Sequence, residues 1–288
     1  MHQQLAPEEE EAASAMLALL LDLLRSREQD RDRLREELAR QADQGPSCLW
    51  FFLRLFASGA TDYGGAAFVH ACHVLALIAD GDAKLCSALR GARLIDILAD
   101  RLLRASEAEE SLATAWLPFA TAAALLMEVL VVTEDSACWQ LADPTLHRPA
   151  WATRHKPDLA VDALLAALRR SLLLEKGSMA VQPLHLSGLT ALGCIARLTN
   201  HTGQQAMRML TNSGLDLGVA VLRVAHADEE AGYVALWYMA EVVASARSPV
   251  VGRISAAGAD GAARRALERY PWSERVQREG RRLLAACG

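Results

Sequence analysis

Apolar residues recur along most of the chain at the spacing of helix faces, whereas the alternating pattern of β-strands is nearly absent. The clearest example is Ala231–Ser245, which reads AGYVALWYMAEVVAS. Leu, Ala and Val supply most of the apolar positions, and Leu and Ala are strong helix formers. The pattern therefore predicts an all-α protein.

Versions of this helical segment occur elsewhere in the chain. Ala235–Val242 aligns with Ala191–Leu198, 44 positions earlier, and small and apolar residues occupy the same places. Weaker copies begin at Ala71, Ala122 and Gly280. Self-similarity at this period is typical of stacked helical units. We expect about five such units in one repeat domain over residues 47–288.

Three glycines mark equivalent places within these units. Gly91, Gly214 and Gly258 each lie between a short helix and a longer one. A glycine permits a left-handed backbone at a helix end, so we expect a sharp turn at each of them. Each unit is thus predicted to contain a short helix, a glycine turn, a second helix, a loop and a third helix.

The N-terminal region, residues 1–46, has a different character. Residues 8–42 form one helical pattern, apolar in its first half and mostly charged in its second, where Leu34 and Leu38 remain to be buried. We expect one long helix that covers the first repeat, ended by Gly45 and Pro46. The alternative is a narrow seam that docks a partner helix.

An insertion interrupts the repeats near residues 143–157. This stretch holds three prolines and no apolar period, and it widens the spacing between the copies at Ala122 and Ala191. We expect a loop that contacts a partner protein, binds the phosphate backbone of a nucleic acid or is solvated. Its candidate contact residues are basic or aromatic, namely Arg148, Trp151, Arg154 and Lys156.

Composition narrows the functional class. The net charge of −5 is too small to indicate nucleic-acid binding by the whole chain. The six cysteines never form a CxxC pair, as expected for buried free thiols in a reducing compartment. The acidic start does not resemble a signal or transit peptide, and the apolar runs Leu17–Leu24 and Ala122–Val132 are too short to cross a bilayer. We expect an intracellular and cytoplasmic protein.

Motifs of catalysis are not found. The chain holds no GxSxG, GxxxxGK[ST] or HExxH pattern and no GxGxxG after a strand. His70, Cys72 and His73 lie close together, but two or three ligands on one helix need partners from elsewhere to bind a metal. We expect neither an enzyme nor a cofactor.

The repeats resemble armadillo repeats. Residues 203–245 and 248–287 follow the pattern of that family, with a turn containing Gly, a second helix of the form xLxxLL, and a third helix similar to AxWALxNLA. Residues 82–132 fit less well, and residues 47–80 and 158–200 fit as partial repeats. The resemblance implies a right-handed superhelix whose third helices line a concave groove.

In peptide-binding armadillo proteins, a ladder of Trp and Asn in this groove clamps an extended peptide. By position, the Trp places hold His73, Ala124, Gly193, Trp237 and Arg282, and the Asn places hold Leu77, Glu128, Arg197, Glu241 and Ala286. Trp237 alone matches the residue of the family. Two of these residues are acidic and favour a basic ligand. The candidate groove residues are Trp237, Glu241, Arg197, Gly193, Glu128 and His73.

The C-terminal helix carries a second candidate surface. Arg275, Arg278 and Arg282 follow an i, i+3, i+7 spacing and would form one basic stripe. This stripe is either the solvated face of a capping helix or a dock for an acidic protein or an anionic surface.

The repeat architecture predicts a protein–protein interaction scaffold, an adaptor or a subunit of a larger assembly. The alternative is an RNA- or anionic-surface-binding repeat protein that uses the loop and these arginines.

Overall fold

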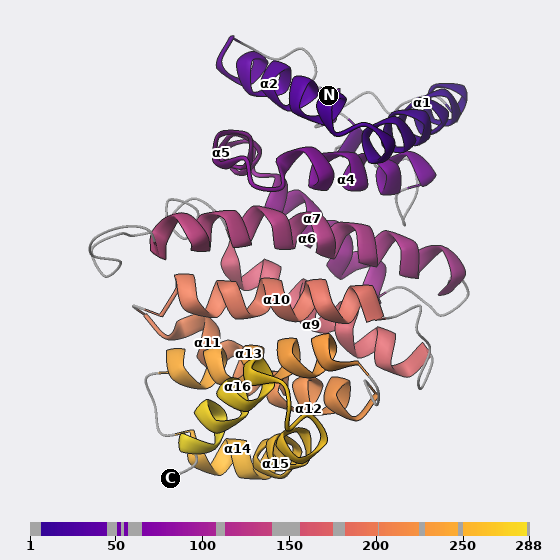
Figure 1. Ribbon diagram of the computed structural model, residues 1–288. Helices are drawn as coiled ribbons and strands as arrows, with labels where there is room; N and C mark the ends of the chain where they lie inside the picture. Colours follow the sequence, from indigo (N-terminus) through magenta and orange to yellow (C-terminus); the bar gives the residue numbers. More distant parts are fainter. Residues whose placement is uncertain are drawn as a thin grey trace.

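The computed structural model describes residues 7–44, 51–52, 55–56, 65–107, 113–139, 156–174, 182–200, 202–224, 228–246 and 250–286. Every regular element in these ranges is an α-helix, which confirms the all-α prediction. The helices form a stack with the N-terminus at one end and the C-terminus at the other (Figure 1).

The N-terminal region contains two helices, so the prediction of one long helix is wrong. Helix α1 covers Pro7–Ser26 and helix α2 covers Glu28–Gln44, with the break at Arg27. The two helices diverge at the top of Figure 1. Because of this turn α1 packs on α4 (Ala66–Ala79) while α2 reaches both α4 and α5 (Ala83–Gly91).

The charged half of this region also has a structural role that its composition did not reveal. The Arg35 guanidinium donates to the carbonyl of Ile78 at 2.8 Å and to that of Asp80 at 3.1 Å. These carbonyls belong to the C-terminal end of α4, where backbone acceptors have no partner within the helix. Leu34 packs against the core beside them. Helix α2 thus packs on the helices α4 and α5 of the first repeat.

The remaining helices follow the predicted units. They are α6 (Leu94–Glu107), α7 (Ala113–Trp139), α9 (Pro157–Leu174), α10 (Gln182–Leu198), α11 (Gln204–Thr211), α12 (Gly214–Val224), α13 (Glu229–Ser245), α14 (Val251–Ala257), α15 (Ala259–Arg269) and α16 (Glu274–Ala285). Helix α7 continues through residues 133–139, ahead of the predicted insertion.

Third helices stack in one row. Helices α4, α7, α10, α13 and α16 lie side by side in this order, and each packs against the next (Figure 1). A second row, formed by α6, α9, α12 and α15, lies behind them. Helix α1 packs on α4 and so extends the first row at its N-terminal end. The repeat prediction is confirmed by this arrangement.

The sharp turns between first and second helices are present, but glycine makes only one of them. Gly258 has a left-handed backbone with φ 67°, whereas Arg93 (φ 61°) and Ser213 (φ 54°) take that conformation in the other two units. Gly91 and Gly214 are helical instead. Gly214 has a packing reason, because an added Cβ would lie 2.6 Å from the Tyr238 hydroxyl and 2.8 Å from the Met209 carbonyl.

A continuous apolar core runs between the two rows. Its largest fully buried side chains include Trp116, Tyr238 and Phe119. Cys72, Cys86 and Cys194 are buried free thiols, and burial raises the pKa of Cys72 and of Cys86.

One core helix also has the composition of a membrane span. Residues 115–133 of α7 are long and apolar enough to cross a bilayer by length and composition alone, whereas the sequence had suggested that this run is too short. The stretch is more than half buried, because α7 packs between α4 and α10. The core helix of a soluble protein has the same properties, so this similarity is weak evidence for a membrane.

Candidate functional site

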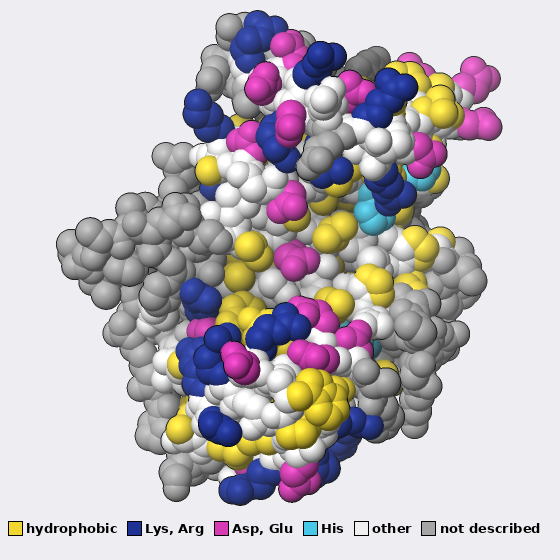
Figure 2. All heavy atoms as spheres, in the orientation of Figure 1, with side chains coloured by type: hydrophobic (Ala, Val, Ile, Leu, Met, Phe, Trp, Pro, Cys, Tyr) yellow, Lys and Arg dark blue, Asp and Glu magenta, His cyan; other side chains and the backbone are white. Residues whose placement is uncertain are grey.

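The exposed side of the third-helix row is hollowed at its N-terminal half. Figure 2 shows hydrophobic side chains gathered over α4, α7 and α10, with isolated acidic side chains among them. A pocket of about 350 Å³ lies here between α1, α4 and α7. We call it the N-terminal pocket. Its lining consists of Leu21, Arg25, His73, Ala76, Leu77, Asp80, Leu125, Glu128, Val129, Val132 and Thr133.

Three residues of this pocket come from the aligned groove positions. His73, Leu77 and Glu128 occupy one Trp place and two Asn places of the third helices, and the structure brings them together in one hollow. Leu21 and Arg25 come from α1, which the repeat alignment does not include. The sequence had no signal for their contribution, because it depends on how α1 packs on α4.

Glu128 carries a poorly solvated carboxyl group in this pocket. Burial raises its pKa, the nearby Asp80 carboxylate raises it further, and a hydrogen bond with the Ser187 side chain opposes the rise. Within the described part of the chain, no lysine or arginine forms an ion pair with Glu128. Because a carboxylate loses hydration when it is buried, a cation placed beside it is stabilising.

His73 contributes an imidazole from α4 to the lining of the pocket. Burial lowers the pKa of His73, and the charges of Arg25 and His70 lower it further. The lower pKa favours the neutral imidazole, and Leu77 and Leu125 add apolar surface to the same lining. The pocket is thus mainly apolar, with two carboxyl groups and one guanidinium group at its walls.

The C-terminal half of the row has a different arrangement around Trp237. This half-buried ring on α13 lies against Gly193 on α10, where an added Cβ would be only 2.4 Å from a ring carbon. The Arg197 guanidinium carbon lies 6.0 Å from the centroid of the same ring. The structure therefore brings together three of the predicted groove residues, Gly193, Arg197 and Trp237.

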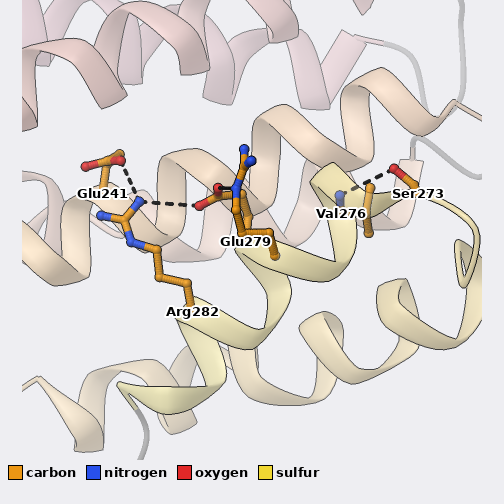
Figure 3. A network of polar contacts seen from close by, with 6 residues as sticks. Glu241, Ser273, Val276, Glu279 and Arg282 are labelled. Atoms are coloured by element: carbon orange, nitrogen blue, oxygen red, sulfur yellow. Dashed lines mark hydrogen bonds and ion pairs between the residues drawn. The ribbon is translucent and has the colours of Figure 1, made fainter.

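Glu241 is engaged within the protein. It is 6% exposed and accepts a hydrogen bond of 2.6 Å from Arg282, and Arg197 Nε lies 4.0 Å from its second oxygen. Arg282 also contacts Glu279, which is 4% exposed and pairs with Arg278 at 2.7 Å (Figure 3). The contact of Arg282 with Glu241 joins α16 to α13, and arginines lie close to both carboxylates.

The predicted basic stripe is likewise neutralised along its length. Arg275 forms ion pairs with Glu230 at 2.7 Å and with Glu229 at 3.5 Å, and its guanidinium lies over the Tyr233 ring at 4.8 Å. Arg278 and Arg282 contact Glu279 and Glu241, as described above. All three arginines of the stripe therefore contact carboxylates of this chain. The docking role of the stripe stays a prediction.

Of the four candidate residues of the insertion loop, the structure describes Lys156 alone. Arg148, Trp151 and Arg154 lie outside the described residues. Lys156 is exposed, and its backbone N–H donates to the Asp96 carboxylate at 3.0 Å. This bond anchors the end of the insertion to α6, and the proposed contact role of the loop stays a prediction.

Comparison with known proteins supports the architecture. The chain superposes on a designed armadillo repeat protein, solved in complex with the peptide (KR)4, with a TM-score of 0.51. The two share 19% sequence identity, and the match covers 82% of this chain and 80% of the designed protein. The fold is that of armadillo repeats. No family model and no curated protein matches the sequence.

The armadillo fold explains the position of the candidate residues, because third helices line one face of such stacks. It is typically used to bind peptides and proteins, and it is usually non-catalytic. Among the residues that the structure describes, no group of three or more His, Cys, Asp or Glu side chains is arranged to hold a metal ion.

Proposed function

We propose that this protein binds an extended segment of a partner protein along its row of third helices, and that the N-terminal pocket receives a basic side chain of that segment. The observation that supports this proposal most directly is Glu128, a poorly hydrated carboxyl group in an apolar hollow at an armadillo groove position. The aliphatic stem of a lysine or arginine would contact the apolar lining, while its charge pairs with the carboxylate.

The charge distribution along the row favours this half of the surface. Glu241, the other acidic groove candidate, already binds Arg282, and Arg197 lies close to it. A basic ligand would have to displace these arginines to reach it. In the C-terminal half, Trp237 is instead the residue that offers apolar contact area, as aromatic residues commonly do in interfaces.

The proposal also fits the solved structural neighbour, which is bound to a peptide of lysine and arginine. Binding of RNA or another anionic surface has less support. That alternative relied on the insertion loop and on Arg275, Arg278 and Arg282, and the guanidinium groups of these three arginines contact carboxylates of this chain. We propose a role as scaffold, adaptor or assembly subunit, without catalysis.

The first test is titration of a fluorescent (KR)4 peptide with the purified protein, followed by fluorescence anisotropy at low salt. We expect saturable binding, and we expect Glu128→Gln to weaken it roughly tenfold, because a charge-assisted contact is lost. The affinity should also decrease as the pH is lowered through the acidic range in which Glu128 becomes protonated, since only the ionised carboxylate attracts the cation. Glu128→Gln should lack this part of the pH dependence.

Glu268→Gln is the matched control, because Glu268 is exposed on α15 and the substitution changes the net charge by the same amount. If both variants weaken binding equally, the peptide responds to overall charge and the pocket is not its site. Absence of any binding by the unmodified protein would reject a basic peptide ligand.

A further inference from the structure

Helix α1 presents an apolar stripe to solvent on the side turned away from α4. Six large hydrophobic side chains are exposed in the described part of the chain, and three of them lie on this helix. Met16 is 69% exposed, Leu19 72% and Leu23 40%. Large apolar side chains gathered on one exposed helix face indicate an interaction surface more than scattered ones do. The opposite face of α1 is buried, through Ala13, Leu17, Leu21 and Leu24.

The exposed residues form a stripe with a symmetric pattern. Its members lie at positions 8, 12, 16, 19, 23 and 27, so their successive spacings of 4, 4, 3, 4 and 4 are the same in both directions. These spacings keep the first five on one side of α1. Arg27 directly follows the last residue of α1, and its backbone N–H still donates to the Leu23 carbonyl at 3.0 Å. The stripe begins with exposed Glu8 and Ala12, and it ends with Arg27, whose side chain is 70% exposed. One end is therefore acidic and the other basic.

This pattern is complementary to itself when two copies of the helix run antiparallel. Met16 of one copy then faces Leu19 of the other, Ala12 faces Leu23, and Glu8 faces Arg27. A twofold axis between the copies makes each of these contacts twice, as in any isologous interface. A parallel arrangement would instead place Glu8 beside Glu8 and Arg27 beside Arg27. Charge complementarity thus selects the antiparallel pair.

We infer that two copies of this chain associate through α1, in an antiparallel helix pair centred between Met16 and Leu19. The apolar residues supply most of the driving force, because exposed ion pairs contribute little in water. Within the part of the chain that the structure describes, the ion pair that Arg27 would give up is a long contact of 3.7 Å with the half-buried Asp30. One helix from each copy makes a small interface, so we expect a dissociation constant of about micromolar order. This inference is independent of the proposed peptide binding.

The test is sedimentation velocity of the full chain over a range of micromolar concentrations at low salt. The unmodified protein should shift from monomer to dimer as its concentration rises. Leu19→Glu should weaken the dimer roughly 100-fold or more, because two apolar contacts are lost per dimer and a charge enters each. Leu173→Glu is the control, since Leu173 is 85% exposed on α9 and lies outside the stripe.

Charge reversal tests the direction of the pair. Glu8→Arg alone and Arg27→Glu alone should each weaken dimerisation by roughly tenfold, because two attractions become two repulsions. The double variant should regain the affinity of the unmodified protein. Failure of the double variant to recover would overturn the antiparallel arrangement, even if Leu19→Glu is monomeric.

Two other outcomes would overturn the proposal as a whole. The first is a protein that stays monomeric throughout, or a dimer that tolerates Leu19→Glu. The second is a monomer that co-sediments with phosphatidylcholine–phosphatidylserine vesicles and loses them on Leu19→Glu, which would assign the stripe to a lipid surface. Circular dichroism of each variant confirms folding, and Leu23→Glu provides an independent disruption of the stripe.

Discussion

The contact between Gly193 and Trp237 sets how closely two neighbouring third helices approach. The Trp237 ring occupies the space that any side chain at position 193 would need. Because both residues lie at the aligned Trp place, one of them in each unit, the large residue of one unit fills the gap left by the small residue of the other. Size is complementary across the helix junction, as expected for a close-packed interior.

A double-mutant cycle tests this complementarity. Gly193→Ala should destabilise the protein by about 1–3 kcal/mol, because the ring must move out of a well-packed position. In a Trp237→Ala background the same change should stabilise by about 0.5–1 kcal/mol, since alanine is the better helix residue. Urea unfolding of the four proteins measures both values.

Gly252→Ala is the control for this cycle, because an added Cβ at that helical position meets nothing within 4 Å. It should be neutral or slightly stabilising. Equal costs of Gly193→Ala in the two backgrounds would show that the ring does not set the spacing.

At the scale of elements, the ion-pair network attaches the last helix to the stack. Glu241 on α13 and Glu279 on α16 are both buried, and Arg282 donates to both of them (Figure 3). Ser273 adds a cap, since its hydroxyl oxygen accepts from the Val276 N–H and its hydroxyl donates to Glu229 at 2.7 Å. Terminal repeats have a neighbour on one side only, so such contacts matter more there.

Removal of the Arg282 charge should lower the stability of the C-terminal end of the stack. Arg282→Met should cost about 2 kcal/mol, less than a fully buried pair would, because Arg282 is partly exposed and Arg278 and Arg197 stay near the carboxylates. Arg281→Met is the matched control, since Arg281 is exposed and its guanidinium donates to the side chain of Gln277, which carries no charge. Thermal unfolding followed by circular dichroism compares the two variants, and equal losses would contradict a special role of the network.

The sequence predicted the elements that rest on a repeated local pattern. The third helix at Ala66–Ala79 and the match between α10 and α13 follow from small and apolar residues at fixed spacing. The turns were predicted less well, because Arg93 and Ser213 adopt a left-handed backbone that no local residue preference favours. The break at Arg27 was missed for a related reason: neither Gly nor Pro marks it, and packing of α1 and α2 on the first repeat determines it.

The repeat pattern also predicted the positions of some candidate site residues, but it did not predict their contacts. Alignment of the repeats placed His73 and Glu128 on the lining of one pocket. The pairing of Glu241 with Arg282 was not foreseen, because it joins residues on two helices that meet only after the units stack. Pattern matching finds which positions share a face, but it does not show which charges on that face neutralise each other.

At the scale of the whole molecule, the central helix α10 joins the two halves of the stack. It packs against α7 on one side and α13 on the other, so a change inside it affects both halves. His185 lies here, 3% exposed, with its Nε2 atom 2.9 Å from the Ser171 hydroxyl. Burial lowers the pKa of His185 from 6.5 to about 4, and the folded protein therefore holds this side chain neutral.

The low pKa of His185 predicts sensitivity to acid. Between pH 6.5 and about 4 the unfolded chain binds a proton that the folded chain does not, so stability should fall as the pH decreases through this window. At about 1.4 kcal/mol per pKa unit, the loss is on the order of 3 kcal/mol. His185→Gln should reduce the slope of unfolding free energy against pH in this window. An unchanged slope would show that other groups account for the acid sensitivity.

The stacking of third helices has one more consequence, which concerns elasticity. Each inner helix of the front row contacts the helix before it and the helix after it. A slight rotation at one junction leaves every other junction intact, and slight rotations at all of them add up along the stack. The curvature of the whole stack can therefore increase or decrease through small changes at every junction, while the packing at each junction is kept.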